Sequence, residues 1–241
     1  MEPQFQQVAI IGLGLIGGSV ALGLKTRGIA AHVTAFDSRP EALQMGLDRR
    51  LIDAIATSPA AAAMGADLVI LAVPVLSMEP IFRQLKPFMA DPDRIVTDVG
   101  SVKCSVWEAA RSALGEYPVN LVPGHPIAGS EQHGVAAADG DLFAHHKVIL
   151  TPKLSTRGAA TRRVREMWQA MDADVVEMEP EHHDTILAQT SHLPHLLAYA
   201  LVDTLSAQGD SLEIFQYAAG GFRDFSRIAA SDPIMWRDIF A

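Results

Sequence analysis

The stretch that most constrains this chain runs over residues 8–20 and reads VAIIGLGLIGGSV. An apolar run of strand type is followed by three glycines, Gly12, Gly14 and Gly17, and then by apolar residues at helical spacing. The pattern predicts a β-strand, a tight turn and the start of an α-helix. Gly12 permits the turn, Gly14 lets a ligand approach the backbone, and Gly17 lets the helix lie close to the strand.

The residues after this helix support a dinucleotide site. A second predicted strand, residues 33–36, ends in Asp37, about 25 residues after Gly12, near the spacing of the acid that binds the adenosine ribose hydroxyls. A carboxylate repels a 2′-phosphate, so Asp37 favours NAD, while Arg39 keeps NADP possible. The alternative is a glycine-rich turn in an ordinary α/β protein, which the strand–turn–helix–strand context disfavours.

Strand and helix patterns alternate up to about residue 179. The expected strands cover residues 8–11, 33–36, 67–73, 94–97, 120–122, 147–151 and 174–178. The expected helices cover residues 40–50, with Ser38 as N-cap, and residues 60–64, 78–89, 102–114 and 159–171. This alternation predicts an α/β fold with a doubly wound, mostly parallel Rossmann sheet.

From residue 181 onward helical spacing dominates. We expect a dinucleotide-binding domain at 1–179 and an all-helical substrate and dimerisation domain at 180–241. A helical domain of about 60 residues has little core of its own, and the amphipathic segment 235–240 is still in progress at the last residue. The helical domain is therefore expected to be incomplete.

Composition excludes several classes of protein. Apolar residues make up 49% and charged residues 20% of the 241 residues, and the net charge is −9. Such a charge argues against nucleic-acid binding. Cys104 is the only cysteine, so an intrachain disulfide is impossible and a reducing compartment is expected. The N-terminal residues fit neither a signal peptide nor a membrane span, which predicts a cytoplasmic protein.

Ligands of open α/β sheets bind beyond the carboxyl ends of the strands. Four segments follow such ends, and we expect them to converge on one crevice: the glycine turn, residues 73–74, residues 98–101 and residues 124–126. The expected cofactor contacts are Gly12, Gly14, Leu15, Ile16, Gly17, Asp37, Val73, Pro74 and Ser101.

Ser101 and His125 are the candidate catalytic residues. His125 lies in a segment framed by proline and glycine, expected to be a loop, and its ordinary pKa suits a general base. The alternative is a solvent-exposed loop histidine. Ser101 precedes a predicted helix and could serve as its N-cap, as a hydrogen-bond partner of a substrate hydroxyl, or as both.

The remaining histidines do not predict a metal site. His192 and His195 are spaced as H-x-x-H, but no third ligand follows from spacing, and Pro194 disrupts their helix. The pairs at 145–146 and 182–183 are equally poor metal signals. His183, with Asp184, is expected to support a helix start.

Arg223 and Arg227 lie in the segment GGFRDFSRIA. One interpretation is a solvated helix face with an arginine–aspartate pair that includes Asp224. The other is recognition of a substrate carboxylate, for which the guanidinium fork is suited.

Together these segments resemble the prephenate/arogenate (cyclohexadienyl) dehydrogenase family of tyrosine biosynthesis. The matching pieces are GLGLIGGS at 12–19, AVP at 72–74, DVGSVK at 98–103, GHPIAGSE at 124–131, SHLPH at 191–195, GGFRDFSRIA at 220–229 and DPIMWRDIF at 232–240.

The resemblance implies NAD(P)-dependent oxidative decarboxylation of prephenate to 4-hydroxyphenylpyruvate, or of arogenate to tyrosine. His125 matches the catalytic histidine that accepts the proton of the ring C4 hydroxyl, and Ser101 matches a serine that orients this histidine and the hydroxyl. Arg227 matches an arginine that binds a substrate carboxylate, and His192 matches a histidine of the substrate site. The helical domain of the family forms a homodimer.

Two departures from the family are present, and two other activities stay open. Ser226 stands where the family often has threonine, and the family's helical domain usually continues beyond residue 241.

A β-hydroxyacid-type dehydrogenase typically uses a lysine in its helical domain, and no lysine follows Lys153. A non-enzymatic NAD-binding regulator would not need His125, Ser101 and Arg227 together.

Overall fold

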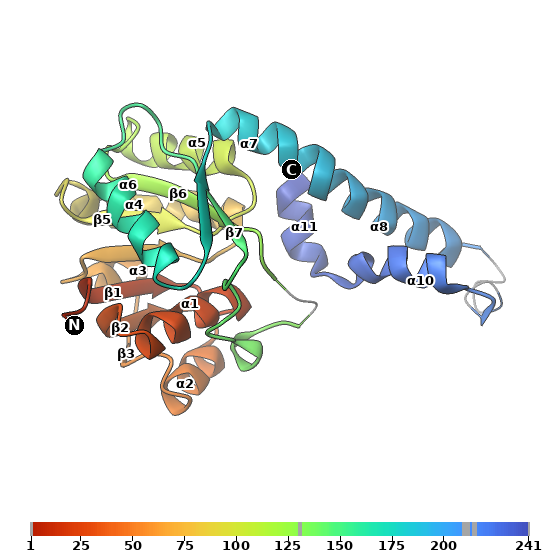
Figure 1. The fold of residues 1–241 in the computed structure, drawn as a ribbon, viewed down its shortest axis with the longest axis horizontal. Helices are drawn as coiled ribbons and strands as arrows, with labels where there is room; N and C mark the ends of the chain where they lie inside the picture. Colours follow the sequence, from red (N-terminus) through yellow and green to blue (C-terminus); the bar gives the residue numbers. More distant parts are fainter. Residues whose placement is uncertain (1, 130–131, 209–212, 214–215, 241) are drawn as a thin grey trace. The chain divides into compact units, whose positions relative to one another are not determined.

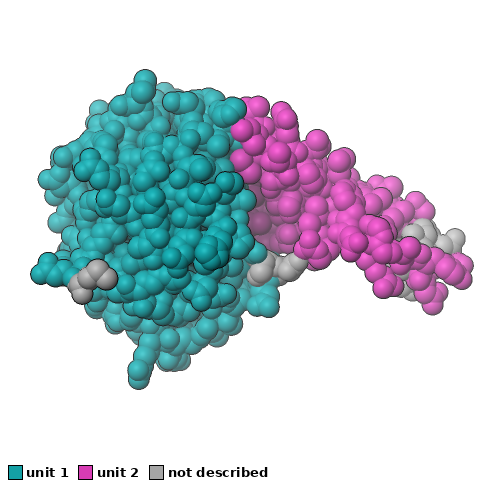
Figure 2. Space-filling view, in the orientation of Figure 1, with its two compact units in different colours: residues 1–183 teal, residues 184–241 magenta. Residues whose placement is uncertain are grey.

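The structure is a computed structural model that describes residues 2–129, 132–208, 213 and 216–240. The chain divides into two compact units, residues 1–183 and residues 184–241 (Figure 2). Ser130 and Glu131, the last residues of the GHPIAGSE motif, lie outside the described residues.

The first unit is built on an eight-stranded sheet with the order β3-β2-β1-β4-β5-β6-β7-β8 (Figure 1). The strands are β1 (Phe5–Ile11), β2 (Ala30–Phe36), β3 (Ala54–Ile55), β4 (Leu68–Leu71), β5 (Ile95–Asp98), β6 (Leu121–Pro126), β7 (Lys147–Leu150) and β8 (Asp174–Glu177). All neighbours pair in parallel except β6 and β7, which are antiparallel. The predicted doubly wound, mostly parallel sheet is confirmed.

Among the described residues, six α-helices cover the two faces of this sheet. One face packs against α1 (Leu15–Thr26), α2 (Pro40–Asp48) and α6 (Gly158–Gln169). The other packs against α3 (Pro59–Ala63), α4 (Met78–Met89) and α5 (Lys103–Leu114). The three-residue turns η1 (Val75–Ser77) and η2 (Val135–Ala137) complete the connections.

The alternation of side chains along β1 explains why two hydrophobic cores form. Val8 and Ile10 belong to the core under α1 and α6, whereas Ala9 and Ile11 belong to the core under α4 and α5. Successive side chains of a strand point to opposite faces, so the apolar run at residues 8–11 of β1 is covered on both sides.

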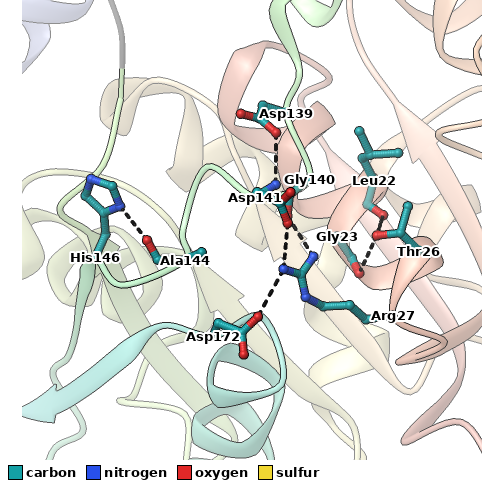
Figure 3. Close-up of polar contacts among 10 residues, drawn as sticks. All are labelled: Leu22, Gly23, Thr26, Arg27, Asp139, Gly140, Asp141, Ala144, His146 and Asp172. Atoms are coloured by element: carbon teal, nitrogen blue, oxygen red, sulfur yellow. Dashed lines mark hydrogen bonds and ion pairs between the residues drawn. The ribbon is translucent and has the colours of Figure 1, made fainter.

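Arg27, just after α1, ties the far end of this helix to two other segments (Figure 3). Its guanidinium donates to the carbonyl of Gly140 (3.0 Å) and to the carboxylates of Asp141 (2.7 Å) and Asp172 (3.2 Å). The two carboxylates raise the pKa of Arg27. Helix α1 is thus fixed at its C-terminal end by contacts more than a hundred residues away in sequence.

Helix α7 (Pro180–Leu187) crosses the division between the units, and a π-helical turn, η3 (Ala188–His192), follows it. The boundary that we expect near Pro180 therefore coincides with the first residue of a helix, and we keep it as a proposal. The second unit continues with α8 (Leu193–Ser206), α10 (Gly220–Ser226), the 3-10 turn η4 (Arg227–Ala230) and α11 (Pro233–Phe240).

The small interior of the second unit centres on Trp236, of which only 6% is exposed. Its ring stacks on His195 at a centroid distance of 3.9 Å. The Tyr199 hydroxyl donates to the carbonyl of Ser231 (2.6 Å). Within the described part of the chain, none of the helices combines the length and the apolar character needed to cross a membrane.

The prediction that Ser38 caps α2 is wrong. The N-cap position is Arg39, without a side-chain cap. The Asp37 carboxylate accepts a hydrogen bond from the Arg39 backbone N–H (2.9 Å), and Pro40 at the start of the helix needs no donor partner. The turn is thus satisfied by the residue before the serine.

Candidate active site

The sheet order brings the four expected strand ends to one edge. Strands β1, β4, β5 and β6 are consecutive neighbours in the sheet and run parallel. The chain segments that leave their carboxyl ends are therefore adjacent. The strand order reverses beside β1, which pairs with β2 on one side and β4 on the other, and such a switch point is where ligands of doubly wound sheets bind.

The glycine turn has the geometry that a dinucleotide requires. Gly12 has φ +98°, and a Cβ there would lie 2.3 Å from the Ala72 carbonyl oxygen. A Cβ on Gly17 would lie 2.0 Å from the Gly12 carbonyl oxygen. Around the Cβ position of Gly14 there is no atom within 4 Å. The turn is thus closely packed at Gly12 and Gly17 and open at Gly14, where α1 presents its first N–H groups.

The other expected cofactor residues surround this turn or follow neighbouring strands. Leu15 and Ile16 form the first, half-buried turn of α1. Val73 is half-buried and Pro74 exposed, both just after β4. The Val73 side chain lies against Gly12, within 2.9 Å of the Cβ position of that glycine. A phosphate at the turn would meet backbone N–H groups and apolar walls.

Asp37 is engaged on both sides of its carboxylate. One oxygen accepts from the Leu13 backbone N–H (2.6 Å), and the other accepts from the Arg39 backbone N–H and from its guanidinium (3.2 Å). The Asp37 carboxylate raises the pKa of Arg39. The Asp37 side chain is only 7% exposed, whereas that of Arg39 is 52% exposed. The cation is thus the more accessible member of the pair.

A fully buried ion pair lies at the carboxyl end of β5, against Gly124 of β6. The Lys103 ammonium donates to the Asp98 carboxylate (2.5 Å) and to the carbonyl of Gly124 (2.7 Å). The Asp98 carboxylate also accepts from the backbone N–H groups of Gly100 and Gly124. Burial raises the pKa of the Asp98 carboxyl, and the Lys103 ammonium opposes this rise. The pair fixes the residue directly before His125.

Ser101 is half-buried and follows β5, but it does not cap α5. The N-cap position is Val102, without a side-chain cap. The predicted capping role is therefore wrong. Asp98 closes the preceding turn through the Gly100 N–H, so the helix starts one residue later than a serine cap would place it. The catalytic role of Ser101 stays a prediction.

His125 lies within β6 and not in a loop. It pairs with Ile149 of the antiparallel strand β7, and its residue is only 9% exposed. The predicted loop is wrong because β7 continues the pairing of β6 beyond Pro123, where the parallel pairing with β5 ends. The alternative of a solvent-exposed histidine is excluded by the same observation. The imidazole is held on a rigid strand at the active edge.

His183 is the site residue that sequence reasoning missed. Its Nε2 atom lies 2.9 Å from Nδ1 of His125, and the residue is fully buried. Helix α7 begins at Pro180, so His183 lies in its first turn, and the expectation that His183 supports a helix start stays a prediction. Two adjacent histidines, His182 and His183, give no periodic pattern in the sequence. The rings of His125 and His183 come together only because the chain passes from β6 through β7 and β8 to α7.

The expected substrate residues of the second unit lie on its helices and turns. His192 ends the π-helical turn η3, Arg223 is exposed on α10, and Arg227 is exposed at the start of η4. Their substrate roles stay predictions. In the ranges that the structure describes, no group of three or more histidine, cysteine, aspartate or glutamate side chains gathers as a metal site.

Two family models match this chain. The model of the prephenate dehydrogenase nucleotide-binding domain matches residues 20–177, and that of the prephenate dehydrogenase dimerization domain matches residues 179–241. Together they cover the sheet unit beyond the glycine turn and all of the helical unit.

Relatives and solved structures agree with these models. The chain is 39% identical to a cyclohexadienyl dehydrogenase of Zymomonas mobilis, over 98% of this chain and 80% of that protein. It is 37% identical to a prephenate dehydrogenase of Bacillus subtilis, over 99% of this chain and 64% of that protein, so it spans less than two thirds of the latter.

Among solved structures, a prephenate dehydrogenase of A. aeolicus in complex with hydroxyphenyl propionate and NAD+ superposes with a TM-score of 0.89. That protein is 40% identical, and the match covers 98% of this chain and 82% of the other. The fold, the two matched models and this identity lead to one conclusion. The chain belongs to the prephenate dehydrogenase family and is an oxidoreductase.

Proposed function

We propose that this chain catalyses the NAD-dependent oxidative decarboxylation of prephenate to 4-hydroxyphenylpyruvate, or of arogenate to tyrosine. The observation that carries the proposal is His125, buried on a rigid strand at the same edge of the sheet as the glycine turn, with one ring nitrogen already engaged. Family membership supports the same reaction over that of a β-hydroxyacid-type dehydrogenase or a non-catalytic regulator.

The proton chemistry is assigned to His125. Its Nε2 atom accepts the proton of the ring C4 hydroxyl while the C4 hydride is lost, which leaves a carbonyl at C4. Cleavage of the bond between C1 and its carboxylate then releases CO2, and the electron pair makes the ring aromatic. His125 returns the proton to the phenolate oxygen. Bound nicotinamide supplies the hydride acceptor, and a positioned base contributes about 10²–10⁴ in rate.

Four other residues are assigned to the proposed site. Ser101, three residues after the end of β5, hydrogen-bonds the C4 hydroxyl and orients it toward His125. Arg227 binds a substrate carboxylate, with Arg223 as a second candidate for this contact, and His192 lines the substrate site. The guanidinium fork suits a carboxylate, and both arginines are exposed on the helical unit.

The cofactor is proposed to be NAD, with NADP as a second possibility. The tight packing at Gly12 and Gly17 and the open space at Gly14 fit a pyrophosphate at the start of α1. Asp37 disfavours a 2′-phosphate, but the half-exposed Arg39 guanidinium beside it offers that phosphate a partner.

We also propose that the helical unit forms a homodimer in the cytoplasm. Leu193, Leu196 and Leu197 on α8 are each about half exposed, at 49%, 47% and 51%, and exposed apolar side chains favour association. The dimerization-domain model covers the same residues. The single cysteine suits a reducing compartment.

One assay tests the proposed reaction. NAD and NADP reduction is followed at the absorbance of the reduced nicotinamide, with prephenate and with arogenate in parallel. We expect reduction with at least one substrate and a preference for NAD. His125→Asn should abolish turnover and leave NAD affinity nearly unchanged. Folded protein that reduces neither cofactor with either substrate, or wild-type rates for His125→Asn, would overturn the proposal.

A further inference from the structure

We propose that His183 is a positioning residue that fixes the tautomer and the orientation of His125. The inference rests on the proposed function, because it concerns the base of that reaction. It starts from one contact: His125 Nδ1 and His183 Nε2 are 2.9 Å apart, and the two rings meet edge to face with centroids 5.1 Å apart.

A hydrogen bond between two imidazole nitrogens needs one donor and one acceptor. If His125 is to accept a substrate proton at Nε2, that nitrogen must carry no hydrogen, and the hydrogen of neutral His125 must sit on Nδ1. His125 Nδ1 then donates to His183 Nε2, and His183 carries its own hydrogen on Nδ1. One contact thus selects the productive tautomer of the base.

Backbone hydrogen bonds hold the residues that carry both rings, His125 and His183, in place. His125 lies on β6, in register with Ile149 of β7. Strand β7 pairs with β8, and the Met178 N–H after β8 donates to the Leu150 carbonyl (3.1 Å). The His183 N–H donates to the Glu179 carbonyl at the start of α7 (2.9 Å). Backbone hydrogen bonds therefore link β6, β7 and β8 to one another and tie the residues that lead into α7.

Burial strengthens the hydrogen bond between His125 and His183. His183 is fully buried and His125 is 9% exposed, so water cannot easily replace either partner. When His125 accepts the substrate proton, its Nδ1–H still donates to His183, and the imidazolium keeps its orientation. A catalytic base is commonly oriented by a further side chain that hydrogen-bonds to it. Here the imidazole of His183 orients His125.

The test compares three variants. His183→Leu removes the acceptor and leaves an apolar side chain, and we expect kcat to fall about 10- to 100-fold while the KM for NAD and for substrate stays within about threefold. His183→Gln places an amide oxygen near the position of Nε2 and should restore most of kcat. His182→Leu, at an exposed histidine on the same helix, is the matched control and should behave as wild type.

Nitrogen NMR of ¹⁵N-histidine-labelled full-length protein separates positioning from a structural role. Neutral His125 should carry its hydrogen on Nδ1 in wild type and His183→Gln, and as a mixture of tautomers in His183→Leu. Unchanged tautomer populations in His183→Leu, or equal kcat losses in the Gln and Leu variants with unchanged thermal stability, would overturn the proposal. The NMR measurement needs no substrate, so it stands even if the wild-type protein reduces neither cofactor and the proposed reaction fails.

Discussion

The buried pair of Lys103 and Asp98 allows a quantitative prediction about stability. Lys103→Met keeps most of the unbranched aliphatic stem and removes the ammonium. The Asp98 carboxylate and the Gly124 carbonyl then each lose one donor. Both side chains are fully buried, so water does not replace what is lost.

Removing one partner of a buried ion pair costs about 3–5 kcal/mol. Asp98 keeps two backbone donors, the N–H groups of Gly100 (2.7 Å) and Gly124 (3.3 Å). We therefore expect the lower end of the range, about 3 kcal/mol near neutral pH. For a chain of this length such a loss lowers the Tm by about 6–12 °C.

The loss should depend on pH. Burial already raises the pKa of Asp98, and Lys103 opposes the rise, so in the variant this pKa is higher still. Above about pH 4 the unfolded carboxyl releases its proton, while the folded variant retains it. Because the folded state then binds more protons, stability falls as pH rises, by up to about 1.4 kcal/mol per pH unit, until the raised pKa is passed.

Urea unfolding followed by circular dichroism at about pH 5.5 and about pH 7.5 measures the effect. The deficit of Lys103→Met relative to wild type should be larger at the higher pH. Adding Asp98→Asn should recover part of it, because no charge remains buried. Lys147→Met, in an exposed pair with Asp174, should cost at most about 1 kcal/mol. A Lys103→Met deficit below about 1 kcal/mol, or one independent of pH, would refute the reasoning.

Three further predictions concern the binding residues. Arg227→Ala should raise the KM for prephenate about tenfold or more with kcat nearly unchanged. An unchanged KM would instead favour the interpretation of Arg227 as part of a solvated helix face. Gly12→Ala places a Cβ against a backbone carbonyl at φ +98° and should lower both Tm and NAD affinity more than Gly28→Ala, whose Cβ position is open; equal losses would contradict the packing argument. Arg39→Ala should reduce NADP activity about tenfold relative to NAD activity, whereas a constant ratio in the same assay would exclude a contact with the 2′-phosphate.

The sheet and its active edge could be predicted because their signals are local. The run of buried apolar residues in β4 and the helical spacing of α4 identify each element from its own sequence, and α4 has the predicted bounds, Met78–Met89. Consecutive parallel strands then place their carboxyl ends together. The positions of Gly12, Ser101 and His125 at one edge follow from this topology.

The parts that could not be predicted depend on pairing between distant segments. The apolar sequence of β7, KVIL, fits a parallel strand and an antiparallel strand equally well. The direction of β7 could therefore not be predicted from its sequence, and neither could the inclusion of His125 in β6. His183 is 58 positions from His125. Lys103 opens a helix, where a lysine is ordinarily exposed, and only the buried Asp98 carboxylate explains its burial.

Because Trp236 stacks on His195, its fluorescence reports on the helical unit alone. The other two tryptophans, Trp107 and Trp168, are buried in the sheet unit. Indole emission responds to the groups in contact with the ring, and the imidazole lies 3.9 Å from it, in the segment that also holds His192. A chain that retains only Trp236 would therefore show, as a change in fluorescence, any event that separates these two rings, independently of absorbance from reduced nicotinamide.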